Sequence, residues 1–153
     1  MYTEIEQETL DIDCFFTDGK YIGFMTSCGG KLPDSVAGSK EEHHVLVNYF
    51  RSLPEISEVL VNSELDRLLI KIVGSGVDER YLEDYVSMTK KGLYSYDKTG
   101  LNNSLDSHYH LVASPNEPLK LESLPKDILN ILSKTRFLNH IENFREINLL
   151  EID

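Results

Sequence analysis

Residues 11–27 have the sequence Asp-Ile-Asp-Cys-Phe-Phe-Thr-Asp-Gly-Lys-Tyr-Ile-Gly-Phe-Met-Thr-Ser. Two largely apolar runs, 11–17 and 21–27, flank Asp18-Gly19. An Asp-Gly pair is a strong signal for a two-residue turn, because both central positions of that turn need a positive φ. The stretch therefore predicts a β-hairpin. The cross-strand pairs expected from this turn are Thr17 with Lys20, Phe16 with Tyr21, Phe15 with Ile22, and Cys14 with Gly23.

Three helices are expected, over 39–53, 79–91 and 124–134, because apolar residues recur there at helical spacing. Ser39 with Glu42 fits a capping box, and Asp78 is a suitable N-cap for the second helix. Further strands are expected over 58–62, 67–73, 93–97, 108–113 and 147–152, with 63–66 as a hairpin connection, although helical periodicity competes over 64–73. The chain has 153 residues, so the pattern predicts one α+β domain over 1–153. Its sheet should be largely antiparallel, with about three helices packed on it.

The charge of the chain is strongly negative, with 26 acidic residues against 15 Lys and Arg and a formal net charge of -11. Six of the acids precede Lys20, the first basic residue. A field of this sign repels nucleic acid and anionic membranes and attracts cationic proteins. No signal peptide or membrane span is evident. Two cysteines, Cys14 and Cys28, are too few for a disulfide framework, so we expect free thiols in a cytoplasmic protein.

Three motifs offer chemistry, and each has a simpler structural interpretation. His108 and His110 lie two residues apart on one face of a predicted strand, a spacing found in metal sites, but no further ligand is fixed by spacing. Gly74-Ser-Gly76 lacks the rest of a phosphate-loop motif. Cys28 has no base fixed near it by the sequence. We therefore expect no catalytic, cofactor-binding or metal-binding residue, and no enzyme activity.

Acidic residues at two predicted surfaces are the candidate partner-binding groups. The first set surrounds the start of the second helix, and the second set lies near the N-terminus. Acids in a first helical turn also stabilise the helix itself, so only the excess points to a partner. The candidates are Asp78, Glu79, Glu83 and Asp84, and then Glu4, Glu6 and Glu8.

Three stretches resemble the immunity proteins of bacterial polymorphic or contact-dependent toxin systems. The first is 13–27, with its strand, glycine turn and strand; the second is Gly30-Lys-Leu-Pro-Asp-Ser-Val36, followed by Ser39, Glu42 and Tyr49-Phe50; the third is Lys91-Gly-Leu-Tyr-Ser-Tyr-Asp97, followed by Tyr109-His-Leu-Val-Ala-Ser-Pro115, Pro118 and Leu124-Pro125. The resemblance implies a cytoplasmic protein that neutralises a cognate toxin by direct binding. It carries no catalytic residues and no binding residues.

The sequence thus favours an acidic immunity protein that occludes a cationic, nuclease-like toxin domain. Two alternatives from other classes remain open. One is a small metal- or ligand-dependent enzyme that uses His108 and His110. The other is a structural or regulatory subunit that pairs through an apolar face.

Overall fold

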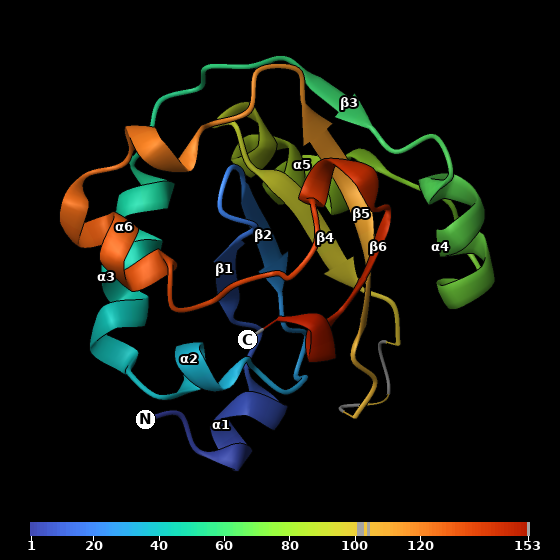
Figure 1. Cartoon of the computed structure of the whole chain (residues 1–153). Helices are drawn as coiled ribbons and strands as arrows, with labels where there is room; N and C mark the ends of the chain where they lie inside the picture. Colours follow the sequence, from blue (N-terminus) through green and yellow to red (C-terminus); the bar gives the residue numbers. More distant parts are fainter. Residues whose placement is uncertain (101–102, 104, 153) are drawn as a thin grey trace.

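A six-stranded, mostly antiparallel sheet forms the centre of the computed structural model, which describes residues 1–100, 103 and 105–152. The sheet curls into a half-barrel (Figure 1). Its order is β1-β2-β4-β5-β3, with β6 also paired to β5. The strands are β1 Asp13–Thr17, β2 Ile22–Thr26, β3 Val59–Val61, β4 Tyr94–Lys98, β5 His108–Pro115 and β6 Glu146–Asn148. Among the strand pairs of the described residues, β2–β4 is the one parallel pair, so the predicted α+β domain with a largely antiparallel sheet is confirmed.

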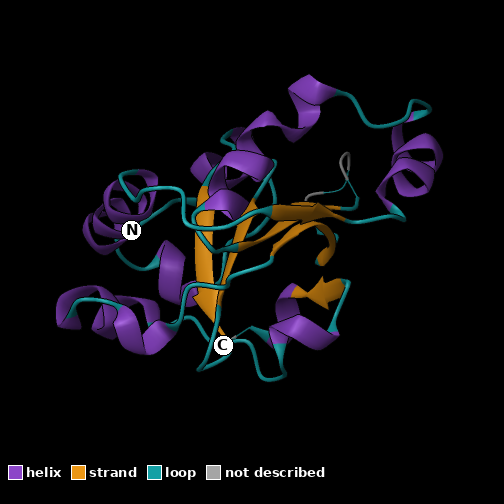
Figure 2. Cartoon of the chain, turned by 90° about the horizontal axis from the view of Figure 1, so that it is seen from above, coloured by secondary structure: helices purple, strands orange, loops and turns teal. Residues whose placement is uncertain are grey.

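Four main helices accompany the sheet, one more than expected. They are α3 Lys40–Arg51, α4 Leu65–Val73, α5 Glu79–Lys90 and α6 Lys126–Leu132, and two short helices, α1 Glu4–Thr9 and α2 Asp34–Ala37, precede them. α5 packs on β4 and β5, while α3 and α6 pack on each other and on β1. Figure 2 shows helices on both sides of the sheet.

The two faces of the sheet carry separate hydrophobic clusters, because successive side chains of a strand point to opposite faces. Phe15 of β1 belongs to the cluster under the main helices, whereas Cys14 and Phe16 belong to the cluster on the other face. The C-terminal segment supplies much of that second cluster, including Phe137, and passes in front of the sheet in Figure 1. Both faces of the β1–β2 hairpin are therefore buried, which fixes its register.

The hairpin forms, but the predicted register is wrong. Thr17 lies opposite Ile22 and Phe16 opposite Gly23, a shift of two residues from the prediction. The turn is longer because one carboxylate oxygen of Asp18 accepts hydrogen bonds from the backbone N–H groups of Lys20 and Tyr21, both at 2.8 Å. Gly19 takes φ +96° in this turn. Phe16 also covers the bare backbone of Gly23, where a Cβ would lie 2.1 Å from the ring.

The strand expected over 67–73 is instead helix α4, and the hairpin connection expected over 63–66 does not exist. Helical periodicity prevails because Leu65 and Leu69 are four residues apart and both enter the cluster under the helices. Gly74 ends α4 in the left-handed conformation, with φ +78°. The strand expected over 58–62 does form, as β3, but it pairs with β5.

The other predicted elements are confirmed with shifted ends. Ser39 caps α3 by accepting from the N–H of Glu42, but the Glu42 carboxylate binds Lys134, so the predicted reciprocal capping box is absent. Asp78 caps α5 by accepting from the N–H of Tyr81. The expected final strand over 147–152 is shorter, since β6 ends at Asn148 and a 3-10 turn follows. α1 and α2 were not predicted.

No helix among the described residues combines the length and the apolar character that crossing a bilayer requires.

Candidate functional site

The acids predicted on α5 divide into two kinds. Asp78 is committed to capping the helix, and Asp84 forms an ion pair with Arg51 of α3. Glu79 and Glu83 are exposed, and within the described part of the chain neither carboxylate lies within ion-pair distance of a basic side chain. Both line a surface hollow along the outer side of α5. The whole lining is Glu55, Glu79, Arg80, Leu82, Glu83, Val86, Ser87 and Lys90.

The acids predicted near the N-terminus lie on α1, and they divide in the same way. Glu6 completes a capping box with Thr3 and forms an ion pair with Lys40. The hydrogen bond from Lys40, followed by the one from the Thr3 backbone, lowers the pKa of Glu6 to about 2. Glu4 and Glu8 are exposed, and no cation of the described residues pairs with them.

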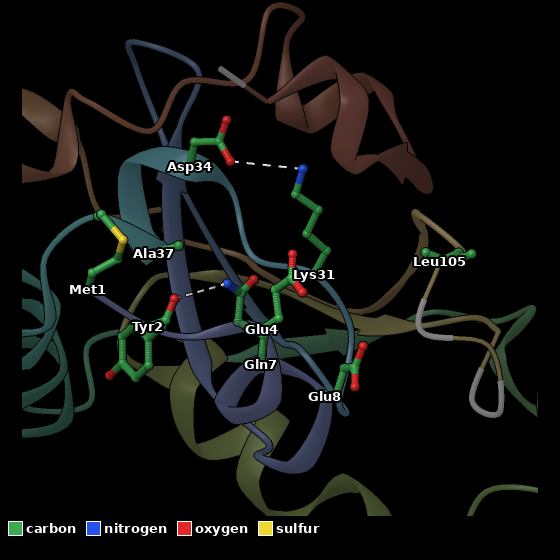
Figure 3. A pocket seen from close by; sticks show the side chains of 10 residues that line it. Met1, Tyr2, Glu4, Gln7, Glu8, Lys31, Asp34, Ala37 and Leu105 are labelled. Carbon is green, nitrogen blue, oxygen red and sulfur yellow. Dashed lines mark hydrogen bonds and ion pairs between the residues drawn. The ribbon is translucent and has the colours of Figure 1, made fainter.

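Glu4 and Glu8 line a second hollow, of about 540 Å³, between α1 and α2. Lys31 and Asp34 of the lining form an ion pair at 3.9 Å, and the Gln7 amide donates to the carbonyl of Tyr2 at 3.4 Å. Figure 3 marks both contacts. Met1 and Leu105 add apolar surface to the lining. The hollow therefore combines two unpaired carboxylates with an apolar rim.

The seven predicted residues do not form one surface. The hollow along α5 and the hollow beside α1 share no lining residue. Four carboxylates are available to a partner, and three are already engaged within the chain. The available residues are Glu4, Glu8, Glu79 and Glu83; the engaged residues are Glu6, Asp78 and Asp84.

The histidine pair is divided by burial. His108 is exposed, and its Nδ1 lies 2.8 Å from Asp106, whereas His110 is only 1 % exposed. Among residues 1–100, 103 and 105–152, no group of three or more His, Cys, Asp or Glu side chains could hold a metal ion. The described residues therefore offer no set of metal ligands that would support the alternative of a metal-dependent enzyme.

Gly74-Ser-Gly76 serves the structure of the α4–α5 connection. Asp66 faces Gly76 and accepts a hydrogen bond from the backbone N–H of Val77 at 2.8 Å. A carboxylate therefore occupies the loop, where a phosphate would be repelled.

Cys28 lies in a tight turn in which both Cys28 and Gly29 have a positive φ, of 45° and 75°. The turn directs the thiol towards Asp97, whose Oδ1 accepts from it at 3.6 Å. Burial, and then the Asp97 charge, raises the pKa of the Cys28 thiol to about 12. His43 gives no help, because it is engaged by Tyr2 and by the carbonyl of Asp13. Cys28 is therefore a protonated thiol, which is a poor nucleophile. Cys14 is fully buried, and both thiols are free.

A row of polar side chains crosses the sheet face that packs against helix α5. The sequence did not predict this row. Thr26 of β2 lies beside Asp97 of β4, and Asp97 lies beside His110 of β5. Residues directly opposite each other on paired strands point to the same face. The three residues are at most 6 % exposed, so they form a buried polar line, and buried polar groups without partners are costly.

Helix α5 satisfies most of this row from above. The Tyr81 hydroxyl donates to Asp97 at 2.6 Å, and the Tyr85 hydroxyl lies 2.8 Å from that of Thr26. The backbone N–H of Lys98 donates to Asp97 at 2.8 Å. His110 is bonded at Nδ1 only, to Thr99 at 3.0 Å. Its Nε2 is the one buried side-chain nitrogen or oxygen without a hydrogen-bond partner in the part of the chain that the structure describes.

A cavity of about 290 Å³ lies between this row and helix α4. Its sheet side is formed by Cys28, Asp97, Lys98 and His110, its α5 side by Tyr81 and Tyr85, its α4 side by Leu69, Ile72 and Val73, and its outer end by Ser75, Gly76 and Asp78. From the sequence, His110 and Cys28 were considered only separately, and Asp97 is a further signal for the site because an aspartate inside a strand is unusual. Comparisons of the chain with protein families, with curated proteins and with solved structures found no match.

Proposed function

We propose that this protein is an acidic immunity-type protein that binds a cationic, nuclease-like toxin domain and blocks it by occlusion. Carboxylates of this chain would face the basic groups with which a nuclease holds phosphate. Such a role needs acids that are exposed and not neutralised within the molecule. The availability of Glu79 and Glu83 on the outer side of α5 is the observation that carries the proposal.

The surroundings of these two acids suit a protein partner. Leu82 and Val86 lie in the same hollow and provide apolar area that a partner's side chain can cover. Tight interfaces combine such desolvated apolar contacts with charged groups at the rim. Glu4 and Glu8 lie beside a separate hollow with Met1 and Leu105, and they form the second candidate surface.

Charge would act mainly on the rate of encounter. A net charge of -11 attracts a basic protein at long range, and this attraction raises the association rate and weakens as salt screens it. Short-range packing in the hollow would then set how slowly the complex dissociates.

The experiment uses the protein encoded immediately upstream of this chain as the candidate toxin. The two proteins are purified, and the expected result is a one-to-one complex that abolishes the toxin's activity. Absence of a complex with an active upstream toxin would contradict the proposal. A stable oligomer of this chain that ignores the toxin would favour the structural subunit instead.

Paired variants then locate the surface. Glu79→Gln with Glu83→Gln should slow association by roughly threefold to tenfold at low salt and flatten its salt dependence. Glu4→Gln with Glu8→Gln tests the second surface. Glu117→Gln with Glu122→Gln removes the same charge from exposed residues outside both hollows and is the matched control. Equal effects in all three pairs would indicate overall charge, and not either hollow, as the determinant.

A further inference from the structure

Strand β3 forms an open edge of the sheet. It pairs with β5 on one side, and among the described residues no other strand pairs with it. It lies at the rim of the molecule in Figure 1. The strand is short, but Val59–Val61 include neither a proline nor a charged residue, and these are residues that keep an edge strand from pairing with another chain. The edge is therefore available to a further strand.

The hydrogen bonds at the two ends of β3 show which of its backbone groups are free. Asn62 donates its N–H to β5 at 2.9 Å, and the carbonyl of Glu58 accepts from the residue that follows β5, at 3.0 Å. Hydrogen-bonded residues alternate along an antiparallel pair, so the N–H and C=O groups of Val59 and Val61 point away from β5. Outside the β3–β5 ladder, no hydrogen bond of the described residues involves these four groups.

A second copy of β3 can use all four free groups at once. When two copies run antiparallel about a two-fold axis at Leu60, Val59 of each copy faces the partner's Val61, and each such pair exchanges two hydrogen bonds. Leu60 then faces the partner's Leu60 in a non-hydrogen-bonded pair, where side chains approach closely. Leu60 is 64 % exposed in the single chain. Burial of this apolar surface would drive the association, because the backbone groups only exchange water for one another.

The charges beside β3 are complementary in this arrangement. The two-fold register places Glu58 opposite the partner's Asn62. Asn62 and Arg145 bond to successive residues of β5, at 2.9 Å and 2.7 Å, so they are neighbours along one edge. Both line a hollow of about 300 Å³ together with Leu60, which brings Glu58 within reach of the partner's Arg145. Glu58 and Arg145 are exposed, and neither forms an ion pair within the part of the chain that the structure describes.

We propose that this chain forms a two-fold symmetric dimer, in which β3 pairs with β3 of a second copy and joins the two sheets into one. The surface shares no residue with the hollow along α5 or the hollow beside α1, so the dimer does not depend on the proposed function. The contact is narrow, and the net charge of -11 on each copy opposes it. The dimer is therefore reversible, with a dissociation constant of about 10 µM or more.

The first test is a cross-link at the two-fold axis. Leu60→Cys places two thiols opposite each other in a non-hydrogen-bonded pair, where Cα atoms lie about 4.5 Å apart, within the span of a disulfide. In a glutathione redox buffer, covalent dimers should form about tenfold faster or more than with Leu138→Cys, because pairing raises the effective concentration. Leu138 is the matched control, since it is 69 % exposed against 64 % for Leu60. The unaltered protein, with its free Cys28, gives the background. Equal rates for the two variants on non-reducing gels would overturn the proposal.

The second test exchanges the two charges and needs no cross-link. Sedimentation velocity from about 10 µM to about 1 mM should show a concentration-dependent dimer of the unaltered chain. Glu58→Arg and Arg145→Glu should each weaken the dimer about fivefold or more, and the double variant should return to within about twofold of the unaltered chain. Glu58→Arg makes each copy less acidic, so it would strengthen the dimer if only overall repulsion mattered. A monomer at every concentration, a stronger dimer with Glu58→Arg, or a double variant no better than the single ones would each overturn the proposal.

Discussion

The outer and inner sides of helix α5 use polar residues in opposite ways. On the outer side, Glu79 and Glu83 are exposed and form no ion pair within the described chain, although Arg80 and Lys90 line the same hollow. On the inner side, Tyr81 and Tyr85 direct their hydroxyls to Asp97 and Thr26 of the sheet. The same twelve-residue helix therefore presents uncommitted charge to the solvent and committed hydrogen bonds to the core.

The difference separates residues that hold the fold from residues that are free to bind. Inner polar groups lie in a low-dielectric layer, where loss of a partner is expensive. Outer carboxylates lie in water, where removal costs little. Substitutions on the two sides should therefore differ in their effect on the free energy of unfolding, and the following predictions begin with the largest effect.

Asp97→Ala should cause the largest loss of stability. The substitution removes the acceptor of the half-buried Tyr81 hydroxyl and of the buried Lys98 N–H, and it leaves the Cys28 thiol with only Thr26 as a polar neighbour. We expect the free energy of unfolding to fall by about 3–5 kcal/mol, measured by urea denaturation. Asp97→Asn keeps one acceptor oxygen and should lose about 1–2 kcal/mol. A loss below about 1 kcal/mol for the alanine variant would mean that the polar row does not stabilise the protein.

Mild acid should also lower the free energy of unfolding. Burial lowers the pKa of His110 below its ordinary 6.5, against a smaller opposing effect of Asp97 and Glu146, and burial likewise lowers the pKa of His43. At a pH just below 6.5, these two histidines therefore bind more protons in the unfolded chain than in the folded chain. Stability is complete above pH 6.5 and is lost as the pH falls below it, by at most about 1.4 kcal/mol per pH unit for each histidine.

Urea denaturation at pH 7.5, 6.5 and 5.5 measures this slope. His110→Leu removes one of the two titrating groups and should reduce the slope, with His43 responsible for what remains. The variant also deletes the unpaired Nε2, so at pH 5.5 it should be at least as stable as the unaltered protein. An identical slope in both proteins would show that folding does not lower the pKa of His110.

Local sequence signals predicted most elements but could not place the polar groups. Helix α5 was predicted because its cap, Asp78, and its apolar face lie close together in the sequence. The hairpin register was wrong because Asp18 bonds to the backbone two and three residues later, which lengthens the turn. The row of Thr26, Asp97 and His110 could not be predicted, because it depends on β2 and β4 pairing across more than sixty residues. For the same reason the sequence could not separate free acids from engaged ones, since Asp84 meets Arg51 only in the fold.

Glu79→Gln with Glu83→Gln should have the smallest effect on stability. The two acids sit four residues apart on one helix, where like charges repel by about 0.2–0.5 kcal/mol, and this offsets what acids contribute near a helix N-terminus. The free energy of unfolding should therefore change by less than about 0.5 kcal/mol in either direction. Asp84→Asn, on the same helix, breaks the pair with Arg51 and should cost about 0.5–1 kcal/mol. If the glutamine pair were instead the more damaging change, these carboxylates would be holding the helix in place, and the outer side of α5 would not be free to meet a partner.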